Sequence, residues 1–332
     1  MIVLAVESSC DETSVSVVKN GREVLSNVIA SQIDTHKKFG GVVPEIASRE
    51  HVEAINSVFQ EAIEKSGIDV NDIDLVVATR GPGLIGALLV GLSAAKAFAY
   101  AIKKPFIGVN HIIGHVCANY ISNPQLEPPF AGLIISGGHT YLLKVKDYVD
   151  FELLGRTRDD AAGEAFDKVA RAMGIGYPGG PIIDNMAKSG DKAAIDFPRV
   201  MLEEGSYDFS FSGLKTAVIN YLHNKEQKDE EINKDDVAAS FQQAVIDVLV
   251  EKTFRLAKEN NYNKIVISGG VSANDGIRSA FEERGNKEGI EIFYPKKVLC
   301  TDNAAMIASA GYYLYKSKSY DTITTANPNL GL

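Results

Sequence analysis

The sequence predicts an α/β protein in which one order of strands and helices occurs twice along 332 residues. The β-rich run 2–7 and the apolar run 132–136 each begin a group of three strands. Each group leads into alternating helices and strands, with glycine-containing turns at corresponding places. Both halves therefore have the order βββ-α-β-α-β-α, which is typical of a duplicated fold. We expect two lobes around a central cleft, at 1–125 and 126–332, the second with a helical insertion at about 160–256.

Local turn and periodicity signals place the elements of each half. Asn20-Gly21 between two extended runs is a strong hairpin signal, and Gly67 ends an amphipathic helix. In the first half we expect strands at 2–7, 14–19, 23–30, 74–79 and 106–109, and helices at 45–65, at 84–101 and after residue 110. In the second half we expect strands at 132–136, 139–145, 151–156, 264–267 and 291–294, a helical region at 161–256, and helices at 272–283 and 301–315.

Charge narrows the class of partner. Lys and Arg number 34 against 43 Asp and Glu, which gives a net charge of −9. Because phosphate groups need basic partners, this charge argues against indiscriminate nucleic-acid binding. A specific RNA contact through local patches such as Lys37-Lys38 or Lys296-Lys297 stays compatible with it.

Cysteine usage and hydropathy indicate the compartment. Residues 1–7 show neither the basic region nor the cleavage site typical of a signal peptide, and the most apolar window, 84–102, is interrupted by Ser93 and Lys96. We therefore expect a cytoplasmic protein that does not enter the membrane. The cysteines have no paired spacing, which argues against a disulfide framework; they are Cys10, Cys117 and Cys300.

His111 and His115 form the most informative pair in the sequence. A spacing of four on a helix places both imidazoles on one face, which suits a single metal ion, although histidines on a solvated face can show the same spacing. Asp302 lies at the corresponding strand-to-helix junction of the second half, so a pseudo-twofold relation would place it opposite the pair. Two imidazoles and one carboxylate are typical of a catalytic Fe²⁺ or Zn²⁺ site with open positions. Asp302 is also suited to cap the helix that follows it.

Two glycine pairs follow strands at corresponding places, in Ser136-Gly137-Gly138-His139 and Ser268-Gly269-Gly270-Val271. Missing side chains let backbone amides approach a phosphate closely, so the paired turns favour a nucleotide, although one such turn alone is more often a hairpin. Asp167 and Asp184 are candidates to accept ribose hydroxyl groups, with a solvated helix face as the alternative.

Short motifs are spread in order along essentially the whole chain, at residues 7–13, 110–115, 136–140, 160–168, 176–180, 210–216, 268–274 and 300–303. Together they resemble the TsaD (Gcp/YgjD) family, the catalytic subunits of tRNA N6-adenosine threonylcarbamoyltransferase, once labelled an endopeptidase. The stretch 34–51 resembles the bacterial branch. The resemblance implies a duplicated actin-like fold of the ASKHA, RNase H-like class.

The resemblance also implies an activity and a set of site residues. The activity is transfer of the L-threonylcarbamoyl group from threonylcarbamoyl-AMP to N6 of the adenosine beside the anticodon, in tRNAs that read codons beginning with A. By position, His111, His115 and Asp302 match the ligands of one Fe²⁺ or Zn²⁺ ion. The adenylate-binding positions match Ile134, Ile135, Ser136, Gly137, Gly138, Asp167, Gly180, Asp184 and Asn274.

Partners are implied in the same way. A TsaD-like subunit is expected to act on tRNA together with a catalytically inert TsaB-like paralogue and a TsaE-like ATPase. A threonylcarbamoyl-AMP synthase is expected to act upstream. We hypothesise that the first lobe, with its helix at 45–65, contacts the paralogue.

The attack of the adenine amine requires loss of a proton. Asp11 and Glu12 follow the first strand and are therefore our hypothetical general bases, although polar residues in a hairpin turn would look the same.

Three other functions share parts of this pattern. An ASKHA-type ATP-dependent small-molecule kinase would share the lobes and glycine turns but has no role for the two histidines and Asp302. A metalloprotease is disfavoured because the sequence lacks His-Glu-x-x-His. An actin-like scaffold subunit would not need the proposed ligands.

Overall fold

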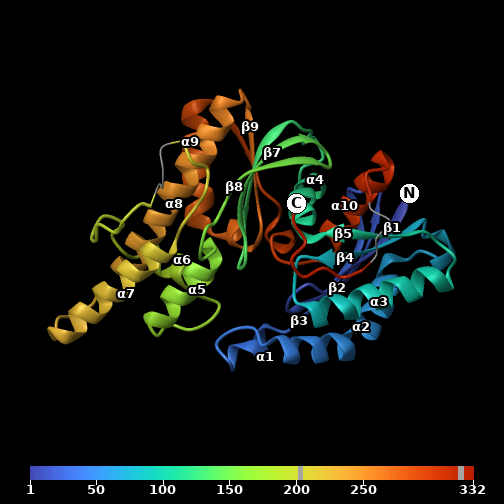
Figure 1. Cartoon of the computed structure of the whole chain (residues 1–332), viewed down its shortest axis with the longest axis horizontal. Coiled ribbons are helices and arrows are strands. Elements are labelled where there is room, and N and C mark those ends of the chain that lie inside the picture. Colours follow the sequence, from blue (N-terminus) through green and yellow to red (C-terminus); the bar gives the residue numbers. More distant parts are fainter. Residues whose placement is uncertain (201–204, 321–324) are drawn as a thin grey trace. The chain divides into compact units, whose positions relative to one another are not determined.

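The computed structural model describes residues 1–200, 205–320 and 325–332, and the chain divides into two compact units (Figure 1). Unit 1 comprises Met1–Pro128, Lys146–Phe151 and Pro295–Leu332. Unit 2 comprises Pro129–Val145 and Glu152–Tyr294. Each unit contains one five-stranded sheet.

The sheet of unit 1 has the order β3-β2-β1-β4-β5. The first three strands are antiparallel neighbours, whereas β4 and β5 run parallel to β1. Asn20 and Gly21 both have positive φ, 54° and 71°, as the expected hairpin turn requires. The strands are β1 (Ile2–Glu7), β2 (Glu12–Lys19), β3 (Glu23–Ser31), β4 (Leu75–Gly81) and β5 (Phe106–Asn110).

Helices cover both faces of this sheet (Figure 1). On one face Leu4 and Val6 of β1 pack with Ile55 of α2 and Leu92 of α3. On the other face α10 lies so close that a Cβ atom on Gly311 would meet Val77 Cγ1 at 2.6 Å. The helices of unit 1 are α1 (Ile33–Lys37), α2 (Pro44–Ser66), η1 (Val70–Asp72), α3 (Ile85–Ala101), α4 (His111–Ser122), η3 (Lys297–Leu299) and α10 (Ala304–Ser317).

The sheet of unit 2 has the order β10-β9-β6-β7-β8. Read from the β8 edge, this is the strand order of unit 1, with β6, β7, β8, β9 and β10 in the places of β1, β2, β3, β4 and β5. β6 and β7 are antiparallel, whereas β9 and β10 continue the sheet in parallel. The strands are β6 (Phe130–Ile135), β7 (Thr140–Asp147), β8 (Asp150–Arg156), β9 (Lys264–Ser268) and β10 (Glu291–Phe293). The helices are α5 (Ala162–Ala172), α6 (Gly179–Ala187), α7 (Ser212–Gln227), α8 (Lys234–Glu259), η2 (Gly270–Ala273) and α9 (Asp275–Glu288).

The duplicated order βββ-α-β-α-β-α is thus confirmed, but the composition of the units differs from the lobes expected at 1–125 and 126–332. The segment from Pro295 onward belongs to unit 1, because α10 packs on β1 and β2 and against α4. Residues 146–151 belong there as well. The expected boundary at residue 125 divides the chain once, so it could not assign α10, which returns to the first sheet, to the first lobe.

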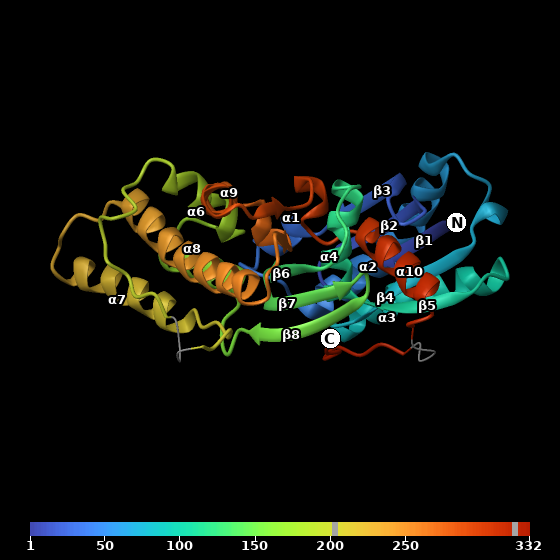
Figure 2. The same cartoon turned by 90° about the horizontal axis from the view of Figure 1, so that it is seen from above.

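The helical region expected at about 160–256 contains α5, α6, α7 and α8. α8 packs against β6 and β9, so it is the layer on the sheet of unit 2, as α2 is in unit 1. The additional helices are α5, α6 and α7, and Figure 2 shows α7 beside α8. Among the described residues between α6 and α7 the chain is not helical, so the region 161–256 is not one continuous helical run.

Two helices begin later than the sequence predicts, and the reason is the same for both. α9 starts at Asp275 rather than 272 because Asn274 is its N-cap, and α10 starts at Ala304 rather than 301 because Asn303 is its N-cap. Within the described part of the chain, none of the helices has the length and apolar character needed to cross a membrane.

Arg22, beside the β2–β3 turn, joins segments of unit 1 that are far apart in sequence. Its guanidinium donates to the carbonyl groups of Pro124 at 2.7 Å and Leu126 at 3.2 Å, and to the Tyr313 hydroxyl group at 2.8 Å. It also donates to the hydroxyl group of Tyr148, whose ring stacks on Tyr313 at a centroid distance of 4.4 Å. One side chain therefore ties residues 146–151 and α10 to the first sheet.

We expect Arg22→Met to lower the free energy of unfolding by about 2–4 kcal/mol, because several acceptors, most of them in part-buried surroundings, lose a charged donor at once. Arg22→Lys should recover less than half of this loss, since an ammonium group lacks the planar fork that reaches several acceptors. Urea unfolding followed by circular dichroism measures both. Equal stability of wild type and Arg22→Met would show that Arg22 does not hold the unit together.

Candidate metal centre and adenylate-binding residues

The two histidines occupy the first turns of α4, directly after the carboxyl end of β5. Asn110 caps the helix, with its Oδ1 accepting from the Ile112 N–H at 2.8 Å. His111 and His115 are both buried, and their rings meet edge to face, with centroids 4.6 Å apart and an interplanar angle of 79°. The predicted spacing therefore does place both imidazoles on one face, and that face is not solvated.

Asp302 lies against the histidine pair. Its Oδ1 is 3.4 Å from His111 Nε2 and 3.3 Å from His115 Nε2, and one ligand atom from each of the three residues lies within 4.8 Å of the others. Asn303, not Asp302, caps α10, so the capping alternative for Asp302 does not hold. Gly114 allows this approach, because a Cβ atom there would meet Ile307 Cδ1 of α10 at 2.6 Å.

Glu7, at the end of β1, orients His111. Its Oε2 accepts from His111 Nδ1 at 3.0 Å and from the Thr79 hydroxyl group at 2.6 Å, and its Oε1 accepts from the Ser9 N–H at 2.6 Å. A carboxylate on Nδ1 fixes the tautomer whose Nε2 carries a lone pair, which is how metal-bound histidines are usually held. Sequence reasoning did not single out Glu7, and its only signal was a charged residue ending an apolar strand.

The charges in this centre favour a cation. Burial lowers the pKa of His111, but the carboxylates of Asp302 and Glu7 outweigh burial and raise that pKa to about 9. Burial lowers the pKa of His115 despite the hydrogen-bonding and charge of Asp302. Burial raises the pKa of Glu7, but His111 and the hydrogen bond of Ser9 more than offset it and hold that pKa below its ordinary value. The pair of carboxylates thus attracts one positive charge to the imidazoles.

The donor set fits a metal ion. Neither ring nitrogen of His115 makes a well-formed hydrogen bond to a described residue, although this side chain is almost completely buried; its polar neighbour is the Asp302 carboxylate, 3.3 Å from Nε2. A buried polar group without a hydrogen-bond partner is costly, and coordination to an ion would remove the cost. Two neutral imidazoles and one carboxylate are ligands of Fe²⁺ and Zn²⁺ sites that keep positions open for substrate.

The two proposed bases differ in environment. Glu12 begins β2, is buried, and accepts from the Ser31 hydroxyl group at 3.2 Å. Burial, together with the charges of Asp11 and Asp302, raises the pKa of Glu12 to about 10, so its carboxyl group is protonated at neutral pH. Asp11 is only half-buried.

In unit 2 the first glycine turn is open. The Ser136 N–H donates to the His139 carbonyl group at 2.8 Å, which closes the turn between β6 and β7. A Cβ atom on Gly137 or Gly138 would meet nothing within 4 Å, and neither residue has positive φ, so packing and backbone do not require glycine here. A ligand that approaches the backbone closely would explain why residues 137 and 138 are glycines. The strand residues that precede the turn, Ile134 and Ile135, are completely buried and can offer only backbone atoms.

The second glycine turn has a different explanation. Gly269 has a φ of 88°, and a Cβ atom there would meet the Ile135 carbonyl oxygen at 2.4 Å. Conformation and packing therefore account for Gly269 without a ligand. Gly270, in contrast, has no positive φ, and a Cβ atom there would meet nothing within 4 Å, so the second turn is open at this residue as the first turn is at Gly137 and Gly138.

Asp167 of α5 and Gly180 of α6 lie on neighbouring helices. Asp167 Oδ1 accepts from the Gly179 N–H at 2.7 Å and so holds the start of α6. A Cβ atom on Gly180 would meet nothing within 4 Å, as at Gly137.

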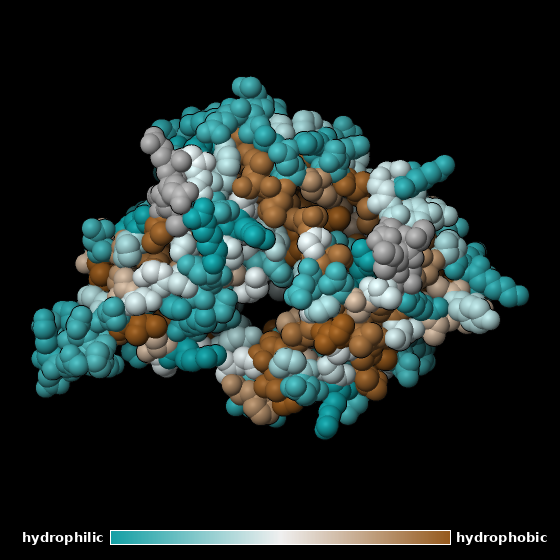
Figure 3. All heavy atoms as spheres, viewed as in Figure 1, coloured by the Kyte–Doolittle hydropathy of each residue, from teal (hydrophilic) through white to brown (hydrophobic). Residues whose placement is uncertain are grey.

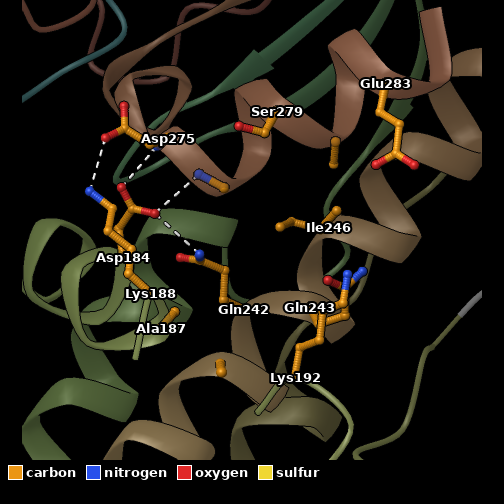
Figure 4. A pocket seen from close by; sticks show the side chains of 13 residues that line it. Asp184, Ala187, Lys188, Lys192, Gln242, Gln243, Ile246, Asp275, Ser279 and Glu283 are labelled. Carbon is orange, nitrogen blue, oxygen red and sulfur yellow. Dashed lines mark hydrogen bonds and ion pairs between the residues drawn. The ribbon is translucent and has the colours of Figure 1, made fainter. Parts of the chain in front are cut away.

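Asp184 and Asn274 are joined by a residue that sequence reasoning missed, Gln242 of α8. Figure 4 shows Gln242 beside Asp184. Gln242 donates to Asp184 Oδ1 at 3.1 Å and accepts from Asn274 Nδ2 at 2.7 Å. Asp184 also accepts from the N–H groups of Asp275 at 2.8 Å and Gly276 at 3.2 Å. A glutamine within a helix gives no sequence signal for such a role. A pocket of about 320 Å³ adjoins this network, and among the predicted substrate residues only Asp184 lines it.

The motif at 210–216 holds the entry to α5. Asp159 accepts from the N–H groups of Phe211 at 2.9 Å and Ser212 at 3.2 Å. The neighbouring Asp160 forms ion pairs with two lysines, Oδ1 with Lys168 Nζ at 2.6 Å and Oδ2 with Lys215 Nζ at 2.7 Å. Burial raises the pKa of Asp160, but the two lysines more than offset burial and lower this pKa to about 2. Asp160 is therefore ionised, and its pairs fix the helix that abuts the open glycine turn.

The fold and the candidate centre define a class of protein: a duplicated α/β fold of the actin-like, ASKHA type, with a histidine–carboxylate site. Two solved structures share the fold, HypF in its phosphate- and nucleotide-bound form and the activator of 2-hydroxyisocaproyl-CoA dehydratase from Clostridium difficile. HypF gives a TM-score of 0.63 at 16% identity, covering 96% of this chain and 47% of that chain. The activator gives 0.52 at 17% identity, covering 97% and 99%.

The chain belongs to the TsaD family of tRNA N6-adenosine threonylcarbamoyltransferases and is therefore a transferase. The family's sequence model matches residues 23–309, which include the candidate metal ligands but not the segment 325–332. A curated tRNA N6-adenosine threonylcarbamoyltransferase from Clostridioides difficile (strain 630) is 61% identical over 331 residues, 99% of this chain and 98% of that protein.

We expect Gly137→Val to leave the free energy of unfolding within about 0.5 kcal/mol of wild type, because the space beside Gly137 is open. The same substitution should weaken AMP binding at least tenfold by filling that space. Calorimetric titration with AMP and thermal unfolding measure the two effects.

The matched control is Gly163→Ala, whose Cβ atom would meet the Ser136 carbonyl oxygen at 2.6 Å. It should lower stability clearly, in contrast to Gly137→Val. If Gly137→Val binds AMP with wild-type affinity, this turn does not belong to the adenylate site.

Proposed function

We propose that this chain transfers the L-threonylcarbamoyl group from threonylcarbamoyl-AMP to N6 of the adenosine beside the anticodon, in tRNAs that read codons beginning with A. The observation that carries the proposal is the arrangement of His111, His115 and Asp302, with His111 oriented by Glu7, in a chain of this family. The products are N6-threonylcarbamoyladenosine in tRNA and AMP.

The residues of unit 1 would hold one Fe²⁺ or Zn²⁺ ion through His111, His115 and Asp302. When bound, the ion would supply a Lewis acid for the carbamoyl carbonyl group. Glu7 keeps His111 in the correct tautomer, and the tight contact at Gly114 keeps α10, and with it Asp302, beside the histidines.

The residues of unit 2 would hold the adenylate part of the donor. The open turn at Gly137 and Gly138 offers backbone amides to the phosphate, and Asp167 and Asp184 are suited to ribose hydroxyl groups. Because AMP is a good leaving group in a mixed anhydride, the protein has to position the donor more than activate it.

For proton removal from the adenine amine, Asp11 is the better supported base. The protonated carboxyl group of Glu12 has no proton-accepting charge at neutral pH, whereas Asp11 is partly exposed.

The partner proposals concern α2 and α3 of unit 1. Large apolar side chains are exposed there: Val52 is 60% exposed, and Ile85 and Leu89 are each 49% exposed. Figure 3 shows apolar side chains over these helices. Such a patch suits a protein partner, and we propose that the TsaB-like paralogue binds it, with the TsaE-like ATPase completing a cytoplasmic complex. Lysines of this acidic chain and of its partners would then share the tRNA contact.

We expect His111→Ala and Asp302→Ala each to reduce transfer at least 100-fold, because each removes one ligand of three. The assay combines the purified chain, a TsaB-like and a TsaE-like subunit, threonylcarbamoyl-AMP and unmodified tRNA. His223→Ala is the matched control, since His223 is an exposed histidine on α7. Wild-type transfer by folded His111→Ala protein would rule out the metal-centre proposal.

In the same assay, Asp11→Ala should slow single-turnover transfer at least tenfold, and Glu12→Gln should change it less than threefold. The reason is that a protonated Glu12 carboxyl group and a glutamine amide carry the same charge. If Asp11→Ala transfers at the wild-type rate, Asp11 is not the base.

A further inference from the structure

The segment 325–332 lies across the end of the first sheet at which β4 and β5 terminate. Ala326 packs against the core formed by β1, α2 and α3. The Asn327 N–H donates to the Arg80 carbonyl group at 2.7 Å, and the Gly83 N–H donates to the Pro328 carbonyl group at 3.1 Å. The segment is therefore hydrogen-bonded to the turn between β4 and α3 on both sides of Gly81.

Gly81 is the point of closest approach. Its φ is 151°, and a Cβ atom there would meet the Asn327 carbonyl oxygen at 1.9 Å and Leu330 Cβ at 3.0 Å. A residue with a side chain would push the segment away. The glycine therefore serves the contact with residues 327–330 as well as the turn.

The far end of the segment reaches the residue that precedes the first histidine. Asn110 Nδ2 donates to the Gly331 carbonyl group at 2.8 Å, while Oδ1 of the same amide accepts from the Ile112 N–H at 2.8 Å. The Nδ2 atom of Asn110 thus bonds to the segment and the Oδ1 atom bonds to the helix. The bond to Gly331 therefore orients the side chain that caps α4. The same turn is joined to the histidine from the other side, because the Leu84 N–H donates to the Ser9 carbonyl group at 2.8 Å and Ser9 Oγ lies 3.2 Å from His111 Nδ1.

We propose that residues 326–331 form a strap that positions His111 through the amide of Asn110. Asn110 and the strap are positioning elements and touch neither the ion nor the substrate. The strap fixes the N-cap, the N-cap fixes the first turn of α4, and the first turn carries His111. This inference rests on the proposed metal centre for its main consequence, the affinity for a divalent ion.

The test uses the full-length, metal-stripped protein and Zn²⁺ alone, with affinity measured by competition against a chromophoric chelator. Deletion of residues 327–332 removes the strap. Asn110→Ser keeps an oxygen that caps the helix but has no amide to reach Gly331. We expect each variant to weaken Zn²⁺ binding about tenfold, the lower end of the range for residues that orient metal ligands. Leu332→Ala leaves every strap contact in place and should bind Zn²⁺ like wild type.

The double variant separates a strap that acts through Asn110 from a general loss of stability. If the strap acts through Asn110, deletion in the Asn110→Ser background should weaken Zn²⁺ binding no further. Multiplied effects, about a hundredfold in total, would overturn the proposal, as would unchanged Zn²⁺ affinity in the deletion variant.

Hydrogen–deuterium exchange of the peptide that covers residues 108–118 gives a readout that needs no metal. Exchange in the first turn of α4 should rise in the deletion variant and in Asn110→Ser, and not in Leu332→Ala. If His111→Ala also binds Zn²⁺ like wild type, the metal centre fails and this exchange alone decides on the strap. Unchanged exchange in the deletion variant would reject the strap whatever His111→Ala shows.

Discussion

The Glu7 carboxylate is the interaction on which the candidate metal centre depends. It is completely buried and accepts from Ser9 in the segment after β1, from Thr79 near the end of β4 and from His111 directly after β5. A buried charge is tolerated only where such partners are complete, so this carboxylate fixes the ends of three neighbouring strands as one body. The geometry of the first histidine is therefore a property of the sheet rather than of α4 alone.

Much of this architecture could be predicted because its signals are local. The Asn20-Gly21 turn, the strand runs and the helix that ends at Gly67 were found near their observed positions. The place of α10 was not, because it depends on a packing surface around Val77 that is distant in sequence. Asp302 could be paired with the histidines only through the duplication of the fold. Gln242 could not be found at all, since polar residues in helices are common and only the folded chain shows its partners.

The proposed adenylate residues of unit 2 fall into two physical kinds. Gly137 and Gly180 have open space beside them, and nothing in the chain itself requires glycine at either position. Asp184 and Asn274 instead bond to the helices around them, so each already has a structural duty. Loss of activity on substitution of Gly137 or Gly180 would therefore indicate loss of adenylate binding. The same loss at Asp184 or Asn274 could also come from weaker packing of α6, α8 and α9.

The return of α10 to the first sheet also constrains the order of events during synthesis. The histidine pair leaves the ribosome early, whereas more than half of the chain separates it from Asp302. A nascent chain thus carries the two imidazoles without Asp302 until all of unit 2 has been made. Any ion bound before then would be held weakly and exchange freely. The three proposed ligands can therefore come together only when the last helix docks on the first sheet.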